Sequence, residues 1–332
     1  MTRLAIVGAG SWGTALAAVL APRFSEIRLW VFEADLAERM RETRENDVYL
    51  PGFRLPENVR VVTDFGEALE GAAIVLGVTP SHVTRAIWRQ MLPHLAPPML
   101  FVSATKGIET QTLSRMSEVV RGVVAERFEP RIAVLSGPTF AREVAAGEPT
   151  AVVISSGDAE LNETVQRAFS GPTLRLYTNS DPAGVELAAS LKNVIAIGAG
   201  VLNGLGSGNN SIAALITRGL AEITRLAVAL GGEPRTLAGL AGLGDLVLTC
   251  TGALSRNRQV GIELGRGRRI EEITASMRMV AEGVHTTYAA MDLALRCGIE
   301  MPITEQVHAI LRSQRSPREA IRELMERSLK RE

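Results

Sequence analysis

The architecture of this chain follows from one short segment, Leu4-Ala5-Ile6-Val7-Gly8-Ala9-Gly10-Ser11-Trp12-Gly13. Its first four residues form an apolar run that ends directly on the glycines, which is typical of a buried parallel strand. The following stretch, Thr14–Leu20, contains good helix formers and small residues, and Pro22 ends it. The segment therefore predicts a strand, a tight turn and a helix packed closely on the sheet.

The three glycines of this segment have separate expected tasks. Gly8 makes the tight turn, Gly10 lets the backbone approach a pyrophosphate, and Gly13 lets the helix pack closely on the strand. The first turn of the helix, with Ser11 and Trp12, offers N–H groups and a partial positive charge to phosphates. Because the motif lies between a strand and a helix, it predicts a dinucleotide site, and a glycine-rich turn without function is the alternative.

A second strand is expected at Ile27–Phe32, and it ends at Glu33, about 20 residues after the glycines. An acidic side chain at this point accepts hydrogen bonds from a ribose 2′-hydroxyl and repels a 2′-phosphate. The pattern favours NAD(H), with NADP(H) kept open as a second cofactor. A solvated glutamate is the alternative interpretation of Glu33, and Phe32 either lies against the adenine or simply packs.

Further apolar runs alternate with helical stretches in the first part of the chain. They are Val59–Val62, Ala73–Val78, Met99–Val102, Ile132–Leu135, Ala151–Ile154 and Leu174–Tyr177. This alternation predicts an α/β fold, with a mostly parallel, doubly wound Rossmann-like sheet covered on both faces. Past Asp181-Pro182 only helical patterns continue. We expect a dinucleotide-binding domain over residues 1–180 and an all-α substrate domain over residues 181–332.

Length and composition limit the class of protein. The 332 residues, 46% of them hydrophobic, suffice for two cores. The 36 basic and 36 acidic residues balance, so a nucleic-acid partner is not expected. No run reaches about 18 uninterrupted apolar residues, so we expect no membrane span and a cytoplasmic protein. Two cysteines, Cys250 and Cys297, and four scattered histidines predict neither a disulfide framework nor a metal site.

Lys192 stands out because it lies in Gly184–Leu202, a segment that is apolar and small nearly all round. A helix of that composition is buried, and a lysine is seldom buried without a partner. We interpret Lys192 as a cleft-facing ammonium that, once desolvated, exchanges a proton near neutral pH. A lysine whose ammonium reaches solvent along the helix side is the alternative.

Strand ends in the first domain supply further candidates. Lys106 follows the Met99–Val102 run, and Ser136-Gly137-Pro138-Thr139 follows the Ile132–Leu135 run. Ligands of open sheets bind at the carboxyl ends of the strands. An ammonium, a hydroxyl and backbone N–H groups at successive strand ends predict a site for an anionic substrate, although each alone is compatible with an ordinary turn.

The second domain contains two polar motifs. A glycine-rich turn, Gly239–Gly244, leads into Asp245, which is either a helix cap or the partner that holds the Lys192 ammonium. Further on, Ser255-Arg256-Asn257-Arg258 precedes a helical pattern. A serine cap, helix N–H groups, a guanidinium and an amide predict a phosphate clamp, with a solvated helix start as the alternative.

Taken in order, these motifs resemble the NAD(P)-dependent glycerol-3-phosphate dehydrogenase family almost end to end. The matching stretches are Gly8–Ala15, Ala104–Gly107, Leu135–Ala141, Leu191–Gly198, Ala241–Leu246 and Ser255–Asn257. The resemblance implies reversible hydride transfer between NAD(P)H and dihydroxyacetone phosphate, a phosphorylated triose, giving sn-glycerol 3-phosphate for glycerophospholipid synthesis. It also implies a homodimer.

The resemblance implies roles for individual residues. Lys192 is the catalytic acid and base, Lys106 holds the substrate and polarises its carbonyl, and Asp245 orients Lys192. The remaining substrate contacts are Gly137, Thr139, Asn193, Thr249, Ser255, Arg256 and Asn257. Cofactor contacts, besides the three glycines and Glu33, are Ser11, Trp12, Phe32, Lys106, Ala141, Arg256, Val280 and Glu282.

Two other functions stay open at this point. Another two-domain β-hydroxyacid or ketopantoate-type reductase shares the fold and a helix-borne lysine, but has no use for Ser255-Arg256-Asn257. A non-catalytic dinucleotide-sensing protein keeps the glycine turn without needing either lysine. The run Gly204–Asn210 is likewise open, as a loop over the cleft or as a helix terminator.

Overall fold

The computed structural model of the chain describes residues 2–275, 277 and 281–329. The chain divides into two compact units. Met1–Lys106 with Ser114–Glu186 forms the first, and Gly107–Leu113 with Leu187–Glu332 forms the second. The division falls inside helix α8 (Pro182–Gly204), a short way past residue 180. Each unit has its own core and is described separately.

The first unit is built on an eight-stranded sheet with the order β3-β2-β1-β4-β5-β6-β7-β8. The strands are β1 (Arg3–Val7), β2 (Glu26–Trp30), β3 (Val59–Val62), β4 (Ala72–Gly77), β5 (Leu100–Ser103), β6 (Arg131–Ser136), β7 (Thr150–Ser155) and β8 (Leu174–Asn179). All neighbouring strands are parallel except β6 and β7. The predicted mostly parallel, doubly wound sheet is therefore confirmed.

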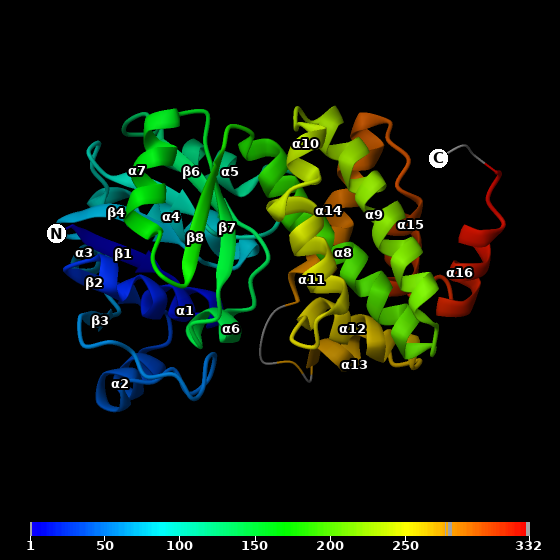
Figure 1. Cartoon of the computed structure of the whole chain (residues 1–332), viewed down its shortest axis with the longest axis horizontal. Coiled ribbons are helices and arrows are strands. Elements are labelled where there is room, and N and C mark those ends of the chain that lie inside the picture. Colours follow the sequence, from blue (N-terminus) through cyan, green and yellow to red (C-terminus); the bar gives the residue numbers. More distant parts are fainter. Residues whose placement is uncertain (1, 276, 278–280, 330–332) are drawn as a thin grey trace. The chain divides into compact units, whose positions relative to one another are not determined.

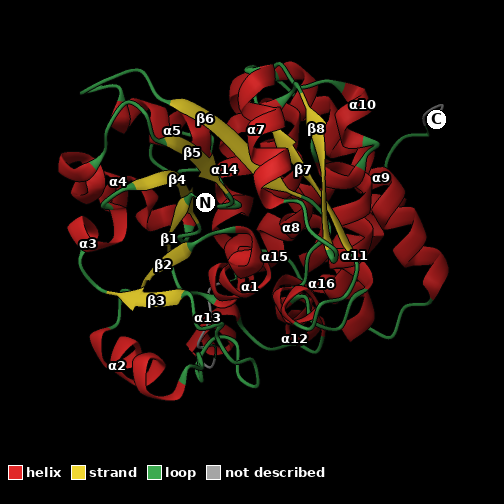
Figure 2. Ribbon diagram, turned by 60° about the vertical axis from the view of Figure 1, so that its left-hand side comes forward, coloured by secondary structure: helices red, strands yellow, loops and turns green. Residues whose placement is uncertain are grey.

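Helices cover both faces of this sheet (Figure 2). Successive residues of β1 point to opposite cores: Leu4 and Ile6 enter one, and Ala5 and Val7 enter the other. The first core contains side chains of α1 (Ser11–Leu20), α2 (Ala34–Thr43) and α7 (Ala159–Phe169). The second contains side chains of α3 (Phe65–Leu69), α4 (Thr84–Met91) and α5 (Met116–Val124). Burial on both faces explains why the strands are continuous apolar runs.

Strand β2 ends earlier than its apolar run predicts. The last regular residue is Trp30, whose carbonyl accepts a hydrogen bond from Gly8 N at 3.2 Å. Val31 makes one more ladder contact, to Val62 O at 2.9 Å, and the chain then turns into α2. Phe32 consequently lies outside the strand with 75% of its surface exposed, and the prediction that the strand includes it is wrong.

The second unit is helical, and its described elements follow one another in Figure 1 as α8 to α16. Beyond α8, they are α9 (Asn209–Ala229), α10 (Pro234–Leu237), the π-helical turn η4 (Leu240–Gly244), α11 (Asp245–Thr251), α12 (Arg256–Gly265), α13 (Ile270–Ala275), α14 (Glu282–Cys297), α15 (Pro302–Leu311) and α16 (Pro317–Met325). The predicted all-α architecture of this region is confirmed.

Helix α8 runs through the core of this unit. Leu191 and Ile195 enter one hydrophobic cluster, and Val194 and Ile197 enter another. The helix is long and apolar enough to cross a membrane by length and composition alone, as is the bent pair Pro234–Thr251 with Arg256–Gly265. However, 94% of the most apolar part of α8 is buried within the protein, as in a core helix.

Four glycines bring α8 and α12 into backbone contact. A Cβ at Gly200 would lie 2.0 Å from the carbonyl oxygen of Arg258, and one at Gly261 would lie 2.0 Å from that of Ile197. One turn further on, Gly204 and Gly265 oppose each other in the same way. Only glycine fits at such a crossing, so this seam fixes how the first turn of α12 is presented.

The glycine-rich run after α8 ends the helix. Gly206 has a φ of +76°, and its N–H donates to Asn203 O at 3.0 Å. Ser207 N donates to Leu202 O at 2.9 Å, and α9 begins at Asn209. Of the two interpretations left open for this run, the geometry is that of a helix terminator.

Candidate functional site

The glycine turn of the first unit joins β1 to α1. Gly8 has a φ of +115°, and a Cβ there would lie 2.6 Å from Val78 O. A Cβ at Gly13 would lie 1.9 Å from Gly8 O, whereas one at Gly10 would meet no protein atom within 4 Å. Gly8 and Gly13 are therefore required by the turn itself, and the small residue at Gly10 keeps the space above the helix start open.

Two residues that the sequence did not single out hold this turn in place. The buried Asn46 donates through Nδ2 to Ala9 O at 2.7 Å and to Thr14 Oγ1 at 2.8 Å. Ser11 Oγ donates to Tyr49 O at 2.6 Å, and Tyr49 N donates to Asn46 Oδ1 at 2.9 Å. Asn46 and Tyr49 lie far along the chain from the glycines, so no local pattern pointed to them.

Glu33 lies three residues past the end of β2 and is half-buried. Its Oε1 accepts a hydrogen bond from Tyr49 Oη at 2.7 Å, and this contact raises the pKa of Tyr49 to about 12. Phe32 beside it projects outward, while Trp12 packs with Ala141 of α6 (Ala141–Ala145) around Ala15, Leu50 and Val144. Apart from Lys106, the predicted cofactor residues of the first unit thus lie near the carboxyl ends of β1 and β2 and at the start of α6.

The ends of β5 and β6 bring three further predicted residues together. Lys106 Nζ donates to Gly137 O at 3.2 Å, and Thr139 Oγ1 donates to the same carbonyl at 3.2 Å. Gly137 has a φ of +147°, and a Cβ there would lie 3.0 Å from Val152 Cα. The antiparallel partner strand β7 therefore requires glycine at this position, and the turn places an ammonium and a hydroxyl on one carbonyl.

In the second unit Lys192 of α8 is buried against an acid. Its Nζ donates to Asp245 Oδ1 at 2.5 Å and to Thr249 Oγ1 at 2.8 Å, and the two charged side chains are 6% and 0% exposed. The hydroxyl of Thr249 donates in turn to Asp245 O at 2.6 Å. Asp245 is the first residue of α11 behind Gly244, so its side chain faces Lys192 instead of capping the helix.

The neighbouring thiol takes no part in acid–base chemistry at neutral pH. Cys250 is buried next to this pair, and burial raises the pKa of its thiol to about 12. A thiol that stays protonated is a poor nucleophile.

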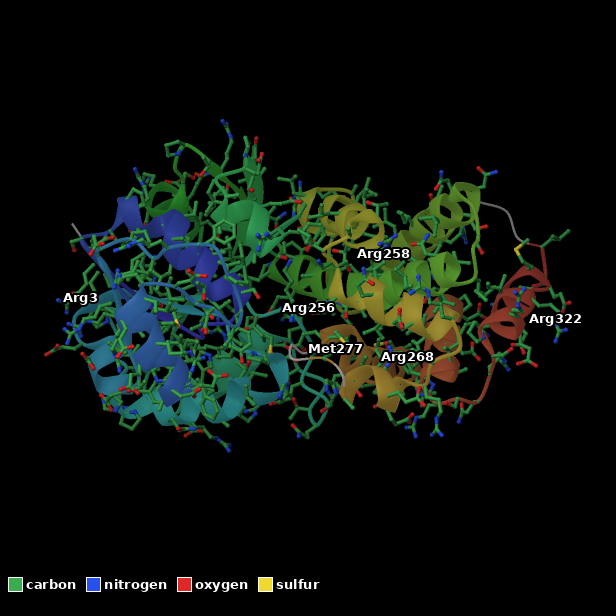
Figure 3. All side chains as sticks on the ribbon, turned by 90° about the horizontal axis from the view of Figure 1, so that it is seen from below. Arg3, Arg256, Arg258, Arg268, Met277 and Arg322 are labelled. Carbon is green, nitrogen blue, oxygen red and sulfur yellow. The ribbon has the colours of Figure 1, made fainter. Side chains whose placement is uncertain are left out.

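The first turn of α12 holds the predicted clamp residues, and Figure 3 labels Arg256 and Arg258 there. Ser255 Oγ accepts from Arg258 N at 3.2 Å and caps the helix. The guanidinium of Arg258 turns back to α8, where Nε donates to Asn203 Oδ1 at 3.0 Å. Arg256, the first residue of the helix, is exposed, and desolvation of its guanidinium lowers its pKa while Glu282 opposes that shift.

Asn257 and Asn193 meet at the start of α14. Asn257 Oδ1 accepts from Gly283 N at 2.9 Å, and a Cβ at Gly283 would lie 2.8 Å from Asn193 O. Glu282, immediately before Gly283, is the first residue of α14. Val280, also predicted to contact the cofactor, lies outside the described residues. In the part of the chain that is described, no three His, Cys, Asp or Glu side chains are grouped to hold a metal ion.

A Rossmann-like sheet with a dinucleotide turn, together with a helical unit that contains a buried lysine–aspartate pair, defines the class of two-domain nicotinamide-dependent dehydrogenases. The comparisons with known proteins narrow this class. Residues 3–162 match the family model described as NAD-dependent glycerol-3-phosphate dehydrogenase N-terminus, and residues 181–322 match that of its C-terminus. The chain belongs to this family of NAD(P)-dependent oxidoreductases.

Relatives match over nearly the whole chain. Glycerol-3-phosphate dehydrogenase [NAD(P)+] of Koribacter versatilis is 58% identical over 329 residues, which cover 98% of each chain. The enzyme of the same name from Syntrophotalea carbinolica is 54% identical, with 99% of each chain covered. The crystal structure of glycerol-3-phosphate dehydrogenase from Coxiella burnetii superposes with a TM-score of 0.94 at 41% identity, covering 98% of this chain and 99% of that one.

A ketopantoate reductase shares the fold alone. The structure from Ralstonia eutropha covers 96% of this chain and 100% of its own, with a TM-score of 0.60 at 18% identity. The ketopantoate-type reductase left open as an alternative thus shares the architecture, whereas the dehydrogenase family matches in sequence as well.

Proposed function

We propose that this protein is a glycerol-3-phosphate dehydrogenase that reversibly reduces dihydroxyacetone phosphate to sn-glycerol 3-phosphate with NAD(P)H. The observation that supports it most directly is the buried contact of Lys192 with Asp245 and Thr249, in a chain of this family. Reduction of a ketone needs a hydride at carbon and a proton at oxygen. The bound nicotinamide supplies the hydride, and Lys192 supplies the proton.

The neighbours of Lys192 suit this task. Asp245 accepts one N–H of the ammonium, and a carboxylate in direct contact with an ammonium stabilises its charge. Thr249 Oγ1 accepts a second N–H of the three that a lysine ammonium carries. A fixed ammonium also stabilises the alkoxide that develops during hydride transfer. In the oxidation direction the neutral amine takes the proton back.

Substrate contacts are proposed in each unit. Lys106 holds the substrate and polarises its carbonyl, with Gly137 and Thr139 beside it. Arg256, Asn257 and Ser255 take the phosphate, since a guanidinium and helix-start N–H groups bind phosphate oxygens well. Asn193 contacts the substrate hydroxyls next to Lys192.

The dinucleotide is assigned to the glycine turn. Gly10 and the start of α1 would hold the pyrophosphate, and Glu33 would accept a hydrogen bond from the adenosine ribose, which favours NAD(H) over NADP(H). The proposed cofactor contacts are Gly8, Gly10, Ser11, Trp12, Gly13, Phe32, Glu33, Lys106, Ala141, Arg256, Val280 and Glu282. Residues 1–180 form the dinucleotide-binding domain, and residues 181–332 form the substrate domain.

In the cell we propose a cytoplasmic homodimer that supplies glycerol 3-phosphate for glycerophospholipid synthesis. The balanced charge and the burial of the long apolar helix α8 support this location. The direction of net flux follows from the cofactor ratio and substrate supply, and the residues described here serve both directions equally.

The test is the absorbance decay of NADH, and separately of NADPH, with purified protein and one of three ketones. Dihydroxyacetone phosphate should be reduced rapidly, unphosphorylated dihydroxyacetone poorly, and ketopantoate not at all. Preference for ketopantoate would favour the other reductase class. Dinucleotide binding without turnover of any ketone would favour a sensing protein.

A further inference from the structure

Tyr49 connects the glycine turn to the acid after β2. Its phenolic O–H donates to Glu33 Oε1 at 2.7 Å, and its carbonyl accepts from Ser11 Oγ at 2.6 Å. Its N–H donates to Asn46 Oδ1 at 2.9 Å, and Asn46 in turn donates to Ala9 O at 2.7 Å. The backbone of Tyr49 is therefore fixed to the glycine turn, while its side chain alone reaches Glu33.

The position of Glu33 is not explained by helix capping. Glu33 is the N-cap residue of α2, but its side chain makes no hydrogen bond to the first turn of that helix. In the described part of the chain, Glu33 has no salt bridge with any arginine or lysine. A neutral phenol holds the carboxylate instead, so its negative charge is oriented without being neutralised.

We propose that Tyr49 is a positioning residue for cofactor selectivity, because it holds the Glu33 carboxylate toward the 2′-hydroxyl of the adenosine ribose. This inference rests on the dinucleotide site of the proposed function. A glutamate on a surface turn samples several rotamers, and a single charge-assisted O–H···O⁻ bond selects one of them. The fixed carboxylate accepts from the 2′-hydroxyl of NAD(H) and repels the 2′-phosphate of NADP(H).

The phenol keeps its proton over the working range of the protein. The contact with Glu33 raises the pKa of Tyr49 to about 12, so the O–H donates throughout neutral and mildly alkaline pH. A released carboxylate can turn away from the incoming 2′-phosphate. Removing the hydroxyl should therefore weaken the discrimination between the two cofactors, and leave the rest of the site unchanged.

The experiment measures the dissociation constants of NADH and NADPH by fluorescence titration without any ketone. The variants are Tyr49→Phe, Glu33→Gln and the double variant. Phenylalanine keeps the backbone contacts to Ser11 and Asn46, so the turn should stay folded, which the thermal midpoint checks. The matched control is Tyr177→Phe, which removes a hydroxyl from the exposed tyrosine of β8.

We expect the ratio of the NADPH to the NADH dissociation constant to fall about three- to tenfold in Tyr49→Phe, the scale of one weakened hydrogen bond. Glu33→Gln should lower it at least as far, and the double variant should match Glu33→Gln because the hydroxyl then has no charge to orient. Tyr177→Phe should behave as the wild type.

Three results would overturn the inference. They are an unchanged ratio in Tyr49→Phe, equal weakening of both cofactors in that variant, and a further fall when Tyr49→Phe is added to Glu33→Gln. Turnover of dihydroxyacetone phosphate is measured separately on the same proteins. A changed ratio without turnover would leave this inference standing and reject the proposed reaction, whereas turnover with an unchanged ratio would do the reverse.

Discussion

At the scale of single residues, the chemistry rests on side chains whose surroundings differ from those of ordinary surface groups. Lys192 is buried and paired, whereas Arg256 is exposed at the first turn of α12. The neighbouring Arg258 is occupied with Asn203. We propose proton transfer for the lysine and phosphate binding for Arg256, and each proposal makes a separate kinetic prediction.

Arg256→Ala should raise the KM for dihydroxyacetone phosphate by about 10- to 100-fold, because a charged hydrogen-bonding group is lost from the substrate. Because Arg256 is also a proposed cofactor contact, both ketones are measured at saturating dinucleotide, where the kcat/KM for unphosphorylated dihydroxyacetone should hardly change. Steady-state kinetics with both ketones make the comparison. The control is Arg268→Ala, since Arg268 pairs with Glu263 after the end of α12. An equal loss on both ketones would show that Arg256 does not bind the phosphate.

Part of the site is predictable from the sequence because one charged residue lies in an otherwise apolar helix. A single lysine in an apolar helix indicates burial and requires a partner, which points to Lys192. Asp245 was ambiguous, since an acid after a glycine turn serves equally well as a cap. Asn46 and Tyr49 escaped notice because their contacts join residues 37 and 38 positions apart, and such contacts leave no periodic pattern.

At the scale of elements, the contact between α8 and α12 fixes the position of the first turn of α12, which contains the proposed phosphate-binding residues. The glycines at Gly200, Gly204, Gly261 and Gly265 are visible in the sequence, but the identity of the helix they touch is not. The strands were easier to predict, because burial on both faces makes them continuous apolar runs. The end of β2 depends on its neighbours β1 and β3, so the apolar run alone placed it too late.

Gly261→Ala should destabilise the protein by about 3 kcal/mol, because the new methyl group would lie 2.0 Å from Ile197 O and 2.8 Å from Gly200 Cα. Neither backbone atom can move without separating the helices. Urea unfolding measures the loss. The control is Gly157→Ala, where a methyl group would meet nothing within 4 Å. Equal stability of the two variants would contradict the tight crossing.

The start of α15 makes a prediction about pH. Glu222 is buried and accepts from Ile303 N at 2.9 Å and Thr304 N at 2.8 Å. Burial raises the pKa of Glu222 above the value of 4.5 that it has in an unfolded chain. Its contribution to stability is therefore fully present below pH 4.5 and is lost as pH rises through the pKa of the folded state.

Glu222→Gln should remove this dependence. The free energy of unfolding of the wild type should fall, relative to that of the variant, as pH rises from about 4.5 toward neutrality. Denaturant titrations of both proteins at several pH values give the difference. If the wild type instead became more stable than Glu222→Gln as pH rises, the two N–H donors would stabilise the charged carboxylate by more than burial destabilises it.

At the scale of the whole molecule, the proposed reaction needs no metal ion. In that proposal Lys192 donates the proton and its ammonium stabilises the alkoxide, which is the task a Lewis acid would otherwise have. Prolonged dialysis against EDTA should leave the rate of NADH oxidation within experimental error of the untreated protein. A loss of activity that added Zn²⁺ or Mg²⁺ restores would contradict this assignment of the chemistry.

Turnover and NADH binding in Lys192 variants test directly whether Lys192 donates the proton. Lys192→Ala leaves Asp245 buried without its partner, so Lys192→Met with Asp245→Asn is the matched neutral pair. The single variant Lys192→Ala and the double variant Lys192→Met/Asp245→Asn should both bind NADH as the wild type does. In both, kcat with dihydroxyacetone phosphate should fall by about 10²- to 10⁴-fold. A folded variant of either kind with near wild-type kcat would show that Lys192 is not the proton donor.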